Sequence, residues 1–131
     1  METTFATFNL KDSLVAGLTK IHFTKPTPVQ EQVIPILLKG QDAIVQSQTG
    51  SGKTHAFLLP FFSQLKANQD LPQLVITSPS RELANQTYEL AKQLLEASGE
   101  TFRMHLYVGG SDKERQIEKL SHQQPDIVIG R

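Results

Sequence analysis

Residues 45–60 read VQSQTGSGKTHAFLLP, and this stretch decides the fold class. Gly50, Gly52, Lys53 and Thr54 stand between a run typical of a strand and a run typical of a helix. A triphosphate needs backbone N–H groups that converge on it and a helix N-terminus that faces the charge. Gly50 and Gly52 leave room for this approach. Lys53 can reach the β- and γ-phosphates, and the Thr54 hydroxyl can ligate Mg²⁺.

One position of this loop departs from the strict phosphate-loop pattern. That pattern has glycine at position 47, where this chain has Ser47. The alternative interpretation is a flexible turn followed by an ordinary solvated lysine. The expected strand before the loop, the expected helix after it and the register of Lys53 and Thr54 favour the phosphate loop.

Length and composition indicate a single globular domain, with 131 residues of which 38% are hydrophobic and 20% charged. The formal net charge is zero, so a polyanionic partner must be argued from local features. The chain has no cysteine, which excludes disulfides and zinc–thiolate sites. Its four histidines, at positions 22, 55, 105 and 122, lack metal-ligand spacing, and we expect them to be structural.

Export and membrane insertion are not expected from this sequence. The N-terminal residues METTFATFNLKDS lack the basic start and apolar stretch of a signal peptide. The apolar runs at 33–38 and 56–62 are shorter than the roughly 20 residues that a membrane span requires. We therefore expect a soluble, cytoplasmic protein without a membrane partner.

Hydrophobic periodicity and capping signals predict alternating strands and helices after an N-terminal helical part. Asn9 is the expected N-cap of the first helix, while Thr27 and Gln30 form an expected capping box, T-x-x-Q. Pro35 and Pro60 should kink, divide or break their helices. The predicted helices cover 10–21, 28–38, 53–65, 83–95 and 111–120, and the predicted strands cover 43–46, 74–77, 102–108 and 127–129.

This alternation predicts an α/β fold with a parallel sheet that has helices on both faces. In such sheets, ligands bind at the carboxyl ends of the strands. Three unusual stretches follow predicted strands, namely the glycine-rich loop, PSREL at 79–83 and the glycine pair at 109–110. We expect all three to share one edge of the sheet.

Four stretches in order resemble the motifs of a known family: FTKPTPVQ at 23–30, SQTGSGKT at 47–54, PSRELANQ at 79–86 and the pair Gly109–Gly110. Together they resemble the first RecA-like domain of a DEAD-box RNA helicase of the bacterial cold-shock type. The resemblance implies that residues 1–131 are a RecA-like P-loop NTPase domain that is truncated, with a Q motif at 5–30. It also implies ATP and Mg²⁺ as cofactors, and ATP-driven unwinding of short RNA duplexes by the full-length protein.

The resemblance assigns a set of nucleotide-binding residues. Gln30 would read adenine, although capping-box pairing with Thr27 explains it as well. Phe5 would stack on the base, or simply pack against Phe8. Lys53 and Thr54 would be catalytic, and Thr54 would hold Mg²⁺ through ATP. The complete set is Phe5, Lys25, Thr27, Gln30, Gln48, Thr49, Gly50, Ser51, Gly52, Lys53 and Thr54.

A second set would bind the RNA phosphate backbone without reading its sequence. It contains Pro79, Arg81, Gly109 and Gly110. Each has an ordinary alternative: Arg81 would be a solvated charge at a helix start, and the glycine pair a plain turn between strand and helix.

Parts of the family's machinery are not found in this sequence. The D-E-A-D and S-A-T motifs are missing, and so is the second RecA-like domain with its arginine finger, which would be a partner of this domain. We therefore expect residues 1–131 alone to bind nucleotide without hydrolysing it. The alternatives are a P-loop NTPase of another class, such as a DNA helicase or translocase, and a non-catalytic nucleotide-binding fragment. The Q motif argues against the first, and the missing acid favours the second for this chain taken alone.

Overall fold

The computed structural model describes residues 3–48, 52–108 and 124–131. Two compact units make up the chain: unit 1 is formed by residues 1–64 and 94–100, and unit 2 by residues 65–93 and 101–131. In the described part of the chain, no helix combines the length and the apolar character that a bilayer crossing requires.

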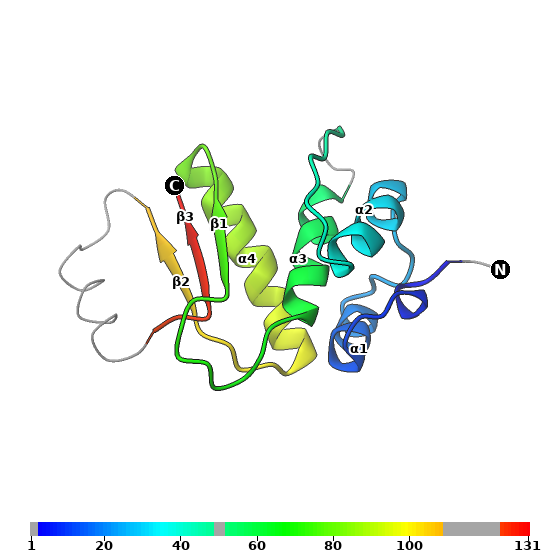
Figure 1. Ribbon diagram of the computed structural model, residues 1–131, viewed down its shortest axis with the longest axis horizontal. Helices are drawn as coiled ribbons and strands as arrows, with labels where there is room; N and C mark the ends of the chain where they lie inside the picture. Colours follow the sequence, from blue (N-terminus) through cyan, green and yellow to red (C-terminus); the bar gives the residue numbers. More distant parts are fainter. Residues whose placement is uncertain (1–2, 49–51, 109–123) are drawn as a thin grey trace. The chain divides into compact units, whose positions relative to one another are not determined.

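Unit 1 is a group of packed helices (Figure 1). It contains the short 3-10 helix η1 (Phe5–Thr7) and the α-helices α1 (Asp12–Lys20), α2 (Pro28–Leu38) and α3 (Lys53–Ser63). The helices predicted at 10–21, 28–38 and 53–65 are thereby confirmed. Buried Val33 and Leu37 of α2 meet buried Ala56 of α3, and this contact forms a core cluster of the unit.

The starts of α1 and α2 show which capping signals were reliable. The capping box of α2 is confirmed: the Thr27 hydroxyl accepts a hydrogen bond from the Gln30 backbone N–H, and the Thr27 N–H donates to Gln30 Oε1 at 2.9 Å. Asn9 as the cap of α1 was wrong, because Lys11 occupies the N-cap position without a side-chain cap bond. The Lys11 backbone N–H instead donates to Ser63 Oγ on α3 at 2.8 Å, so a tertiary contact fixes this helix start.

The break predicted near Pro60 is not found, and Pro35 does not divide its helix. Helix α2 continues through Pro35, and α3 continues through Pro60. A proline removes one backbone hydrogen bond, but packing on both sides of it can hold the remaining turns. Pro60 is fully buried beside Leu59 and Phe62, which are also buried, so tertiary packing offsets the lost bond.

The predicted strand at 43–46 is not formed, and this prediction was wrong. Residues 41–48 run from α2 to the phosphate loop without strand pairing. A parallel strand is stable only when a neighbouring strand takes its backbone hydrogen bonds. None of the three strands in the described residues pairs with this segment. The phosphate loop is therefore not attached to a strand of the observed sheet.

Unit 2 contains a three-stranded parallel sheet in the order β1-β3-β2. Its strands are β1 (Leu74–Thr77), β2 (Met104–Tyr107) and β3 (Ile127–Gly130), and helix α4 (Arg81–Ser98) follows β1. The strands predicted at 74–77, 102–108 and 127–129 are confirmed, the second of them shorter than predicted. Because β3 lies between β1 and β2, the chain crosses over the sheet, which confirms the parallel α/β class.

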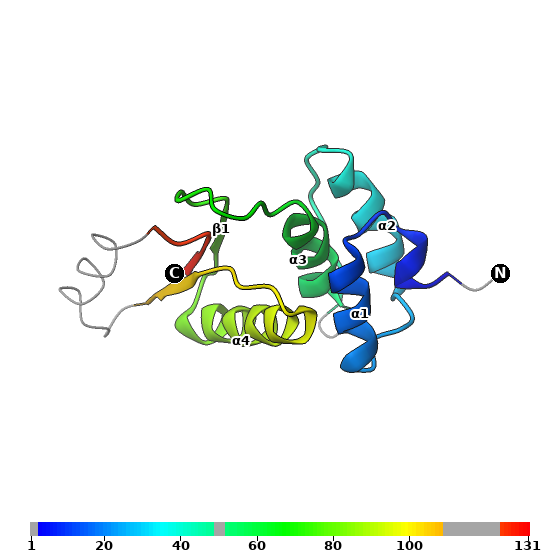
Figure 2. The same ribbon diagram turned by 90° about the horizontal axis from the view of Figure 1, so that it is seen from below.

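One face of this sheet is covered by the part of α4 that belongs to unit 2 (Figure 2). Ile127 and Ile129 of β3 are fully buried, while Val128 and Gly130 between and after them are half-buried, as the two-residue period of a strand requires. The helix predicted at 111–120 lies outside the described residues. Coverage of the second face therefore stays a prediction.

The carboxyl ends of all three strands lie at one edge of the sheet. Thr77 of β1, Gly130 of β3 and Tyr107 of β2 are in register with one another. At the opposite edge, the Asp126 carboxylate accepts from Gln73 Nε2 at 3.1 Å and from the Arg103 N–H at 3.0 Å. This carboxylate joins the starts of the three strands and so fixes their register.

Candidate nucleotide-binding site

The described part of the phosphate loop ends on helix α3, as the sequence predicted. Helix α3 begins at Lys53, directly after Gly52. Lys53 and Thr54 are half-buried, and Gln48 is exposed. Lys53 Nζ donates to the backbone carbonyl of Ser47 at 2.5 Å, so the ammonium group lies against its own loop. Thr49, Gly50 and Ser51 lie outside the described residues.

The start of α3 favours an anion more than the other helix starts of this unit do. Gly52 is its N-cap and offers no side-chain acceptor, and the first turn contains no acidic residue. Helix α2, by contrast, has the Thr27 side chain as a cap and Glu31 in its first turn. A helix N-terminus carries a partial positive charge, to which Lys53 adds a full one. The electrostatics of this corner therefore suit a phosphate group.

Gly52 is required by both backbone conformation and space. Its φ of 93° lies in the left-handed region that disfavours side chains. A Cβ atom there would be 2.5 Å from Gln30 Nε2 and 2.8 Å from Thr27 Oγ1. The phosphate loop thus lies directly against the start of α2, and the structure brings these residues of the predicted site together.

The Gln30 side chain connects these two parts of unit 1. It is 3% exposed, its Oε1 accepts from the Thr27 N–H, and its Nε2 donates to the Gly52 carbonyl at 3.2 Å. The capping-box role considered from the sequence is therefore present. An amide offers two donor hydrogens and two acceptor lone pairs, so one of each is not used by these bonds.

Phe5 is buried, at 3% exposure, and its ring centroid lies 6.4 Å from that of Phe8. The packing alternative for Phe5 is thereby observed. Phe5 also lines a hollow of about 230 Å³ together with Phe23 and Thr24. Gln30 does not line this hollow, and Lys25, the neighbour of Thr24, is exposed.

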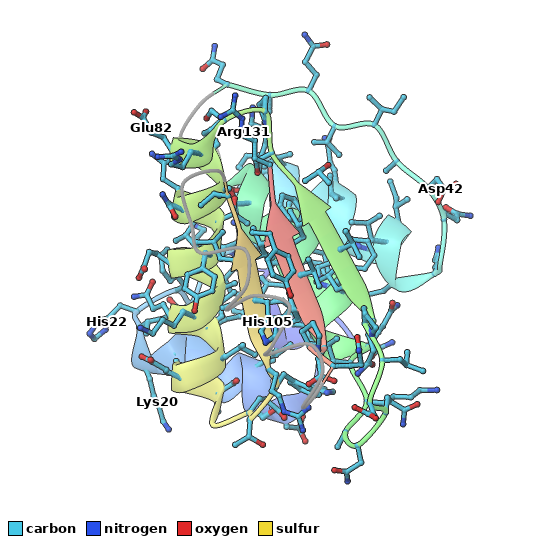
Figure 3. The ribbon with its side chains drawn as sticks, turned by 90° about the vertical axis from the view of Figure 1, so that its left-hand side faces the viewer. Lys20, His22, Asp42, Glu82, His105 and Arg131 are labelled. Atoms are coloured by element: carbon cyan, nitrogen blue, oxygen red, sulfur yellow. The ribbon has the colours of Figure 1, made fainter. Side chains whose placement is uncertain are left out.

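His22 occupies a backbone conformation that glycine adopts readily. Its φ is 65°, in the left-handed region that non-glycine residues seldom adopt. The exposed imidazole points away from unit 1 near Lys20 (Figure 3). The turn therefore forms with histidine at this position, at some cost in backbone conformational free energy.

His55 is a feature of the site that the sequence did not distinguish from the other histidines. It is 7% exposed, and its ring packs against Phe23 with the centroids 5.0 Å apart. Its Nε2 is buried without a hydrogen-bond partner. Burial lowers the pKa of His55 below its ordinary value. No sequence signal reveals this, because the contact joins Phe23 to a helix that begins thirty residues later in the chain.

We expect acidification to destabilise the protein through His55. Its imidazole protonates more readily in the unfolded chain, where the pKa is about 6.5, than in the folded protein. The free energy of unfolding should therefore be retained at pH 7 and fall as the pH drops below about 6.5. His55→Phe should reduce this fall, and should raise stability at pH 7 by about 1 kcal/mol, because it removes an unsatisfied buried nitrogen while keeping a ring beside Phe23.

Urea unfolding followed by circular dichroism at several pH values measures this effect. His22→Asn is the matched control, because it removes an exposed imidazole and asparagine tolerates the left-handed backbone. The control should keep the acid sensitivity of the original protein. Equal loss of stability on acidification in His55→Phe and the original protein would contradict the assignment to His55.

Two of the four residues predicted to contact RNA, Pro79 and Arg81, lie at the carboxyl edge of the sheet in unit 2. Pro79 and Arg81 are exposed, between the end of β1 and the first turn of α4. Figure 3 shows Arg131, directly after β3, at the same end of the sheet as Glu82 in the first turn of α4. Gly109 and Gly110, which follow β2, lie outside the described residues. The expected position at this edge therefore holds for PSREL, whereas no strand of the described sheet leads into the phosphate loop.

Known proteins resemble this chain over nearly its whole length. The chain is 44% identical to the DEAD-box ATP-dependent RNA helicase CshB of Bacillus cereus and 42% identical to that of Bacillus subtilis, with 98% of the chain covered in each case. The chain spans about 30% of the length of these relatives. A crystal structure of a DEAD box protein from the hyperthermophile Methanococcus jannaschii matches with a TM-score of 0.86 and 32% identity, covering 99% of this chain and 35% of that one.

The model of the family described as DEAD/DEAH box helicase matches residues 27–131, from the capping box of α2 to the end of β3. This range includes the uncapped start of α3 and the Gln30–Gly52 contact. With these motifs in order and the fold in agreement, the chain belongs to the DEAD/DEAH box helicase family.

Proposed function

We propose that the full-length protein is a cytoplasmic ATP-dependent RNA helicase, and that residues 1–131 supply the first, adenine-nucleotide-binding part of its first RecA-like domain. Membership of the helicase family and the names of the relatives support the activity. The observation that carries nucleotide binding is the start of α3, where Lys53 follows a glycine N-cap and no acidic residue stands in the first turn. A second RecA-like domain in the full-length protein would complete the catalytic site.

The phosphates of ATP would bind at this helix start. The first-turn N–H groups and the Lys53 ammonium would donate hydrogen bonds to the phosphates. For Lys53, the phosphates would take the place of the Ser47 carbonyl that it now contacts. Thr54, half-buried in the first turn of α3, would hold Mg²⁺ together with the phosphates. When it is bound, the metal ion would neutralise part of the phosphate charge.

Adenine would be selected by Gln30. Its amide keeps one donor hydrogen and one acceptor lone pair beyond the bonds to Thr27 and Gly52. Adenine presents a donor next to an acceptor on one edge, which such an amide can match, whereas guanine presents the wrong pattern. Because the same side chain bonds the Gly52 carbonyl, base recognition at Gln30 would also stabilise the loop that binds the phosphates.

RNA would be bound through its phosphate backbone at the carboxyl edge of the sheet. Exposed Arg81 at the start of α4 would supply a cation at this edge, two residues after exposed Pro79. Without a second domain closing on the strand, such contacts give weak binding that falls with salt. We propose that Gly109 and Gly110 contact the RNA backbone as well.

Lys53→Ala should weaken ATP and ADP binding by about 10- to 100-fold without unfolding the protein, the loss expected for a charge-assisted hydrogen bond. Isothermal titration calorimetry measures it. Lys66→Ala, which removes an exposed lysine from unit 2, is the control and should bind nucleotide normally. If folded Lys53→Ala binds ATP as tightly as the original protein does, the phosphate-loop proposal is wrong. If the original protein binds adenine and guanine nucleotides with equal affinity, the proposal of adenine selection by Gln30 is wrong.

The same preparation tests whether residues 1–131 carry catalytic groups of their own. Residues 1–131 should release no phosphate from ATP above background, because an arginine finger alone contributes about 10³–10⁵ in rate and the D-E-A-D acids are not in this sequence. RNA-stimulated phosphate release that is lost in Lys53→Ala would show that this chain carries catalytic groups of its own.

A further inference from the structure

His55 is a buried polar side chain that the nucleotide site proposed above does not use. It is 7% exposed and stands in the first turn of α3, directly after Thr54. Its Nε2 has no hydrogen-bond partner in the described part of the chain, and a buried nitrogen without a partner costs stability. The contact that the imidazole does make is with the Phe23 ring, at a centroid distance of 5.0 Å and an interplanar angle of 58°.

Phe23 is the first residue of the segment 23–30, FTKPTPVQ, and it is attached to two helices of unit 1. Its backbone N–H donates to the Leu18 carbonyl in α1 at 2.8 Å. Its side chain packs on His55 of α3 and also lines the hollow of about 230 Å³ that Phe5 lines. Phe23 therefore connects the corner of α1, where this hollow lies, with the start of α3.

The other end of the segment 23–30 contacts the same turn of α3. Gln30 Nε2 donates to the carbonyl of Gly52, which is the N-cap of α3 and stands three residues before His55. Gly52 and His55 lie within one helical turn, so the start of α3 holds both ends of this segment. The attachment at Gln30 is a hydrogen bond, and the attachment at Phe23 is ring packing.

We propose that His55 is a positioning residue, which through Phe23 fixes the base-binding part of the nucleotide site relative to the phosphate-binding start of α3. This inference rests on the nucleotide site proposed above and adds a residue to it. A segment that is already held in its bound conformation loses less conformational entropy when the ligand binds. Without the attachment at Phe23, the nucleotide itself would have to order the segment 23–30. Only a ligand with a base would then lose affinity.

Calorimetry with ADP and with pyrophosphate, both with Mg²⁺, separates the two parts of the site in the full-length protein. Pyrophosphate offers the phosphates without the base. His55→Ala should weaken ADP binding by about tenfold, the entropy of ordering roughly one further residue, and should change pyrophosphate binding by less than about twofold. His55→Phe keeps a ring beside Phe23, so it should bind both ligands as the original protein does.

Phe61→Ala is the control for a general loss of packing in unit 1. Phe61 is half-buried against the core cluster of α2 and α3, further along α3 than His55. The substitution should lower the free energy of unfolding but leave the ratio of the ADP and pyrophosphate affinities as it is in the original protein. A role of His55 in stability alone would give His55→Ala this same unchanged ratio.

Phe23→Ala removes the same contact from its more exposed partner, at 40% exposure, so the test does not depend on the folding of His55→Ala. It should weaken the binding of ADP and not of pyrophosphate. Adding His55→Ala to it should cause no further loss, because both changes remove one interaction.

Three results would overturn the role of His55: an unchanged affinity ratio in His55→Ala, a loss of ADP binding in His55→Phe, or a full additional loss in the double variant. If the original protein binds neither ADP nor pyrophosphate, the nucleotide site is wrong and the role of His55 with it. The two failures are thereby distinguished.

Discussion

Gly52→Ala is expected to lower the free energy of unfolding by about 2–4 kcal/mol and to abolish measurable nucleotide binding. The left-handed φ of 93° costs a side chain about 1–2 kcal/mol. The new Cβ would also lie 2.5 Å from Gln30 Nε2 and 2.8 Å from Thr27 Oγ1, and such overpacking adds about 1–3 kcal/mol. Relief of this contact must move either the phosphate loop or the start of α2. Urea unfolding and calorimetry with ATP measure the two effects.

Gly40→Ala separates conformational strain from steric contact. Gly40 has a φ of 79°, but no atom lies within 4 Å of the position of a Cβ there. It should therefore lose only about 1 kcal/mol and keep normal nucleotide binding. If Gly40→Ala and Gly52→Ala are equally destabilised, the contact with Gln30 and Thr27 contributes nothing.

The double variant Gln30→Ala/Gly52→Ala tests whether contact with Gln30 causes the loss of stability in Gly52→Ala. Removal of the Gln30 amide opens space beside residue 52, so the loss of stability in the double variant should be smaller than the sum of the two single losses. Additive losses would mean that the Cβ of residue 52 does not meet Gln30.

Gly17→Ala is expected to destabilise unit 1 by about 2–4 kcal/mol, although alanine is the better helix former. A Cβ at Gly17 of α1 would lie 2.8 Å from the Ser98 backbone nitrogen and 2.9 Å from the Ala97 carbonyl carbon. Both atoms are backbone, so neither can turn aside as a flexible side chain would. Helix propensity alone predicts a gain of about 1 kcal/mol, so the sign of the measured change decides between the two effects.

The neighbouring Ala16 provides the control for Gly17. Ala16 is exposed on the same helix, and Ala16→Gly should cost about 0.5–1 kcal/mol through propensity alone. Thermal and urea unfolding of both variants measure the contrast. A stabilised Gly17→Ala would show that α1 and the end of α4 do not approach as closely as the structure has them.

The features that the sequence determined are those whose cause lies within a few residues. The start of α2 follows from Thr27 and Gln30, three positions apart, which satisfy each other's backbone groups. The beginning of α3 at Lys53 follows from the glycine-rich loop before it. The strands near 74–77 and 127–129 follow from apolar, β-branched runs. The order of these motifs was enough to indicate the family.

Other local signals were overruled by distant parts of the chain. The run at 43–46 has the composition of a strand, but a strand exists only with a partner, and the described residues offer it none. Asn9 was displaced as a helix cap because Ser63 binds the backbone of Lys11. Pro60 did not end α3 because burial of its neighbours holds the helix together.

Only the tertiary structure decided how the candidate site is built. From the sequence, Gln30 and Gly52 were expected to have separate roles, whereas the fold joins them through the bond from Gln30 Nε2 to the Gly52 carbonyl. It also buried His55 against Phe23 and placed Gly17 against Ser98. Each of these contacts joins residues far apart in the chain, so its energy depends on packing between elements and leaves no periodic or local pattern in the sequence.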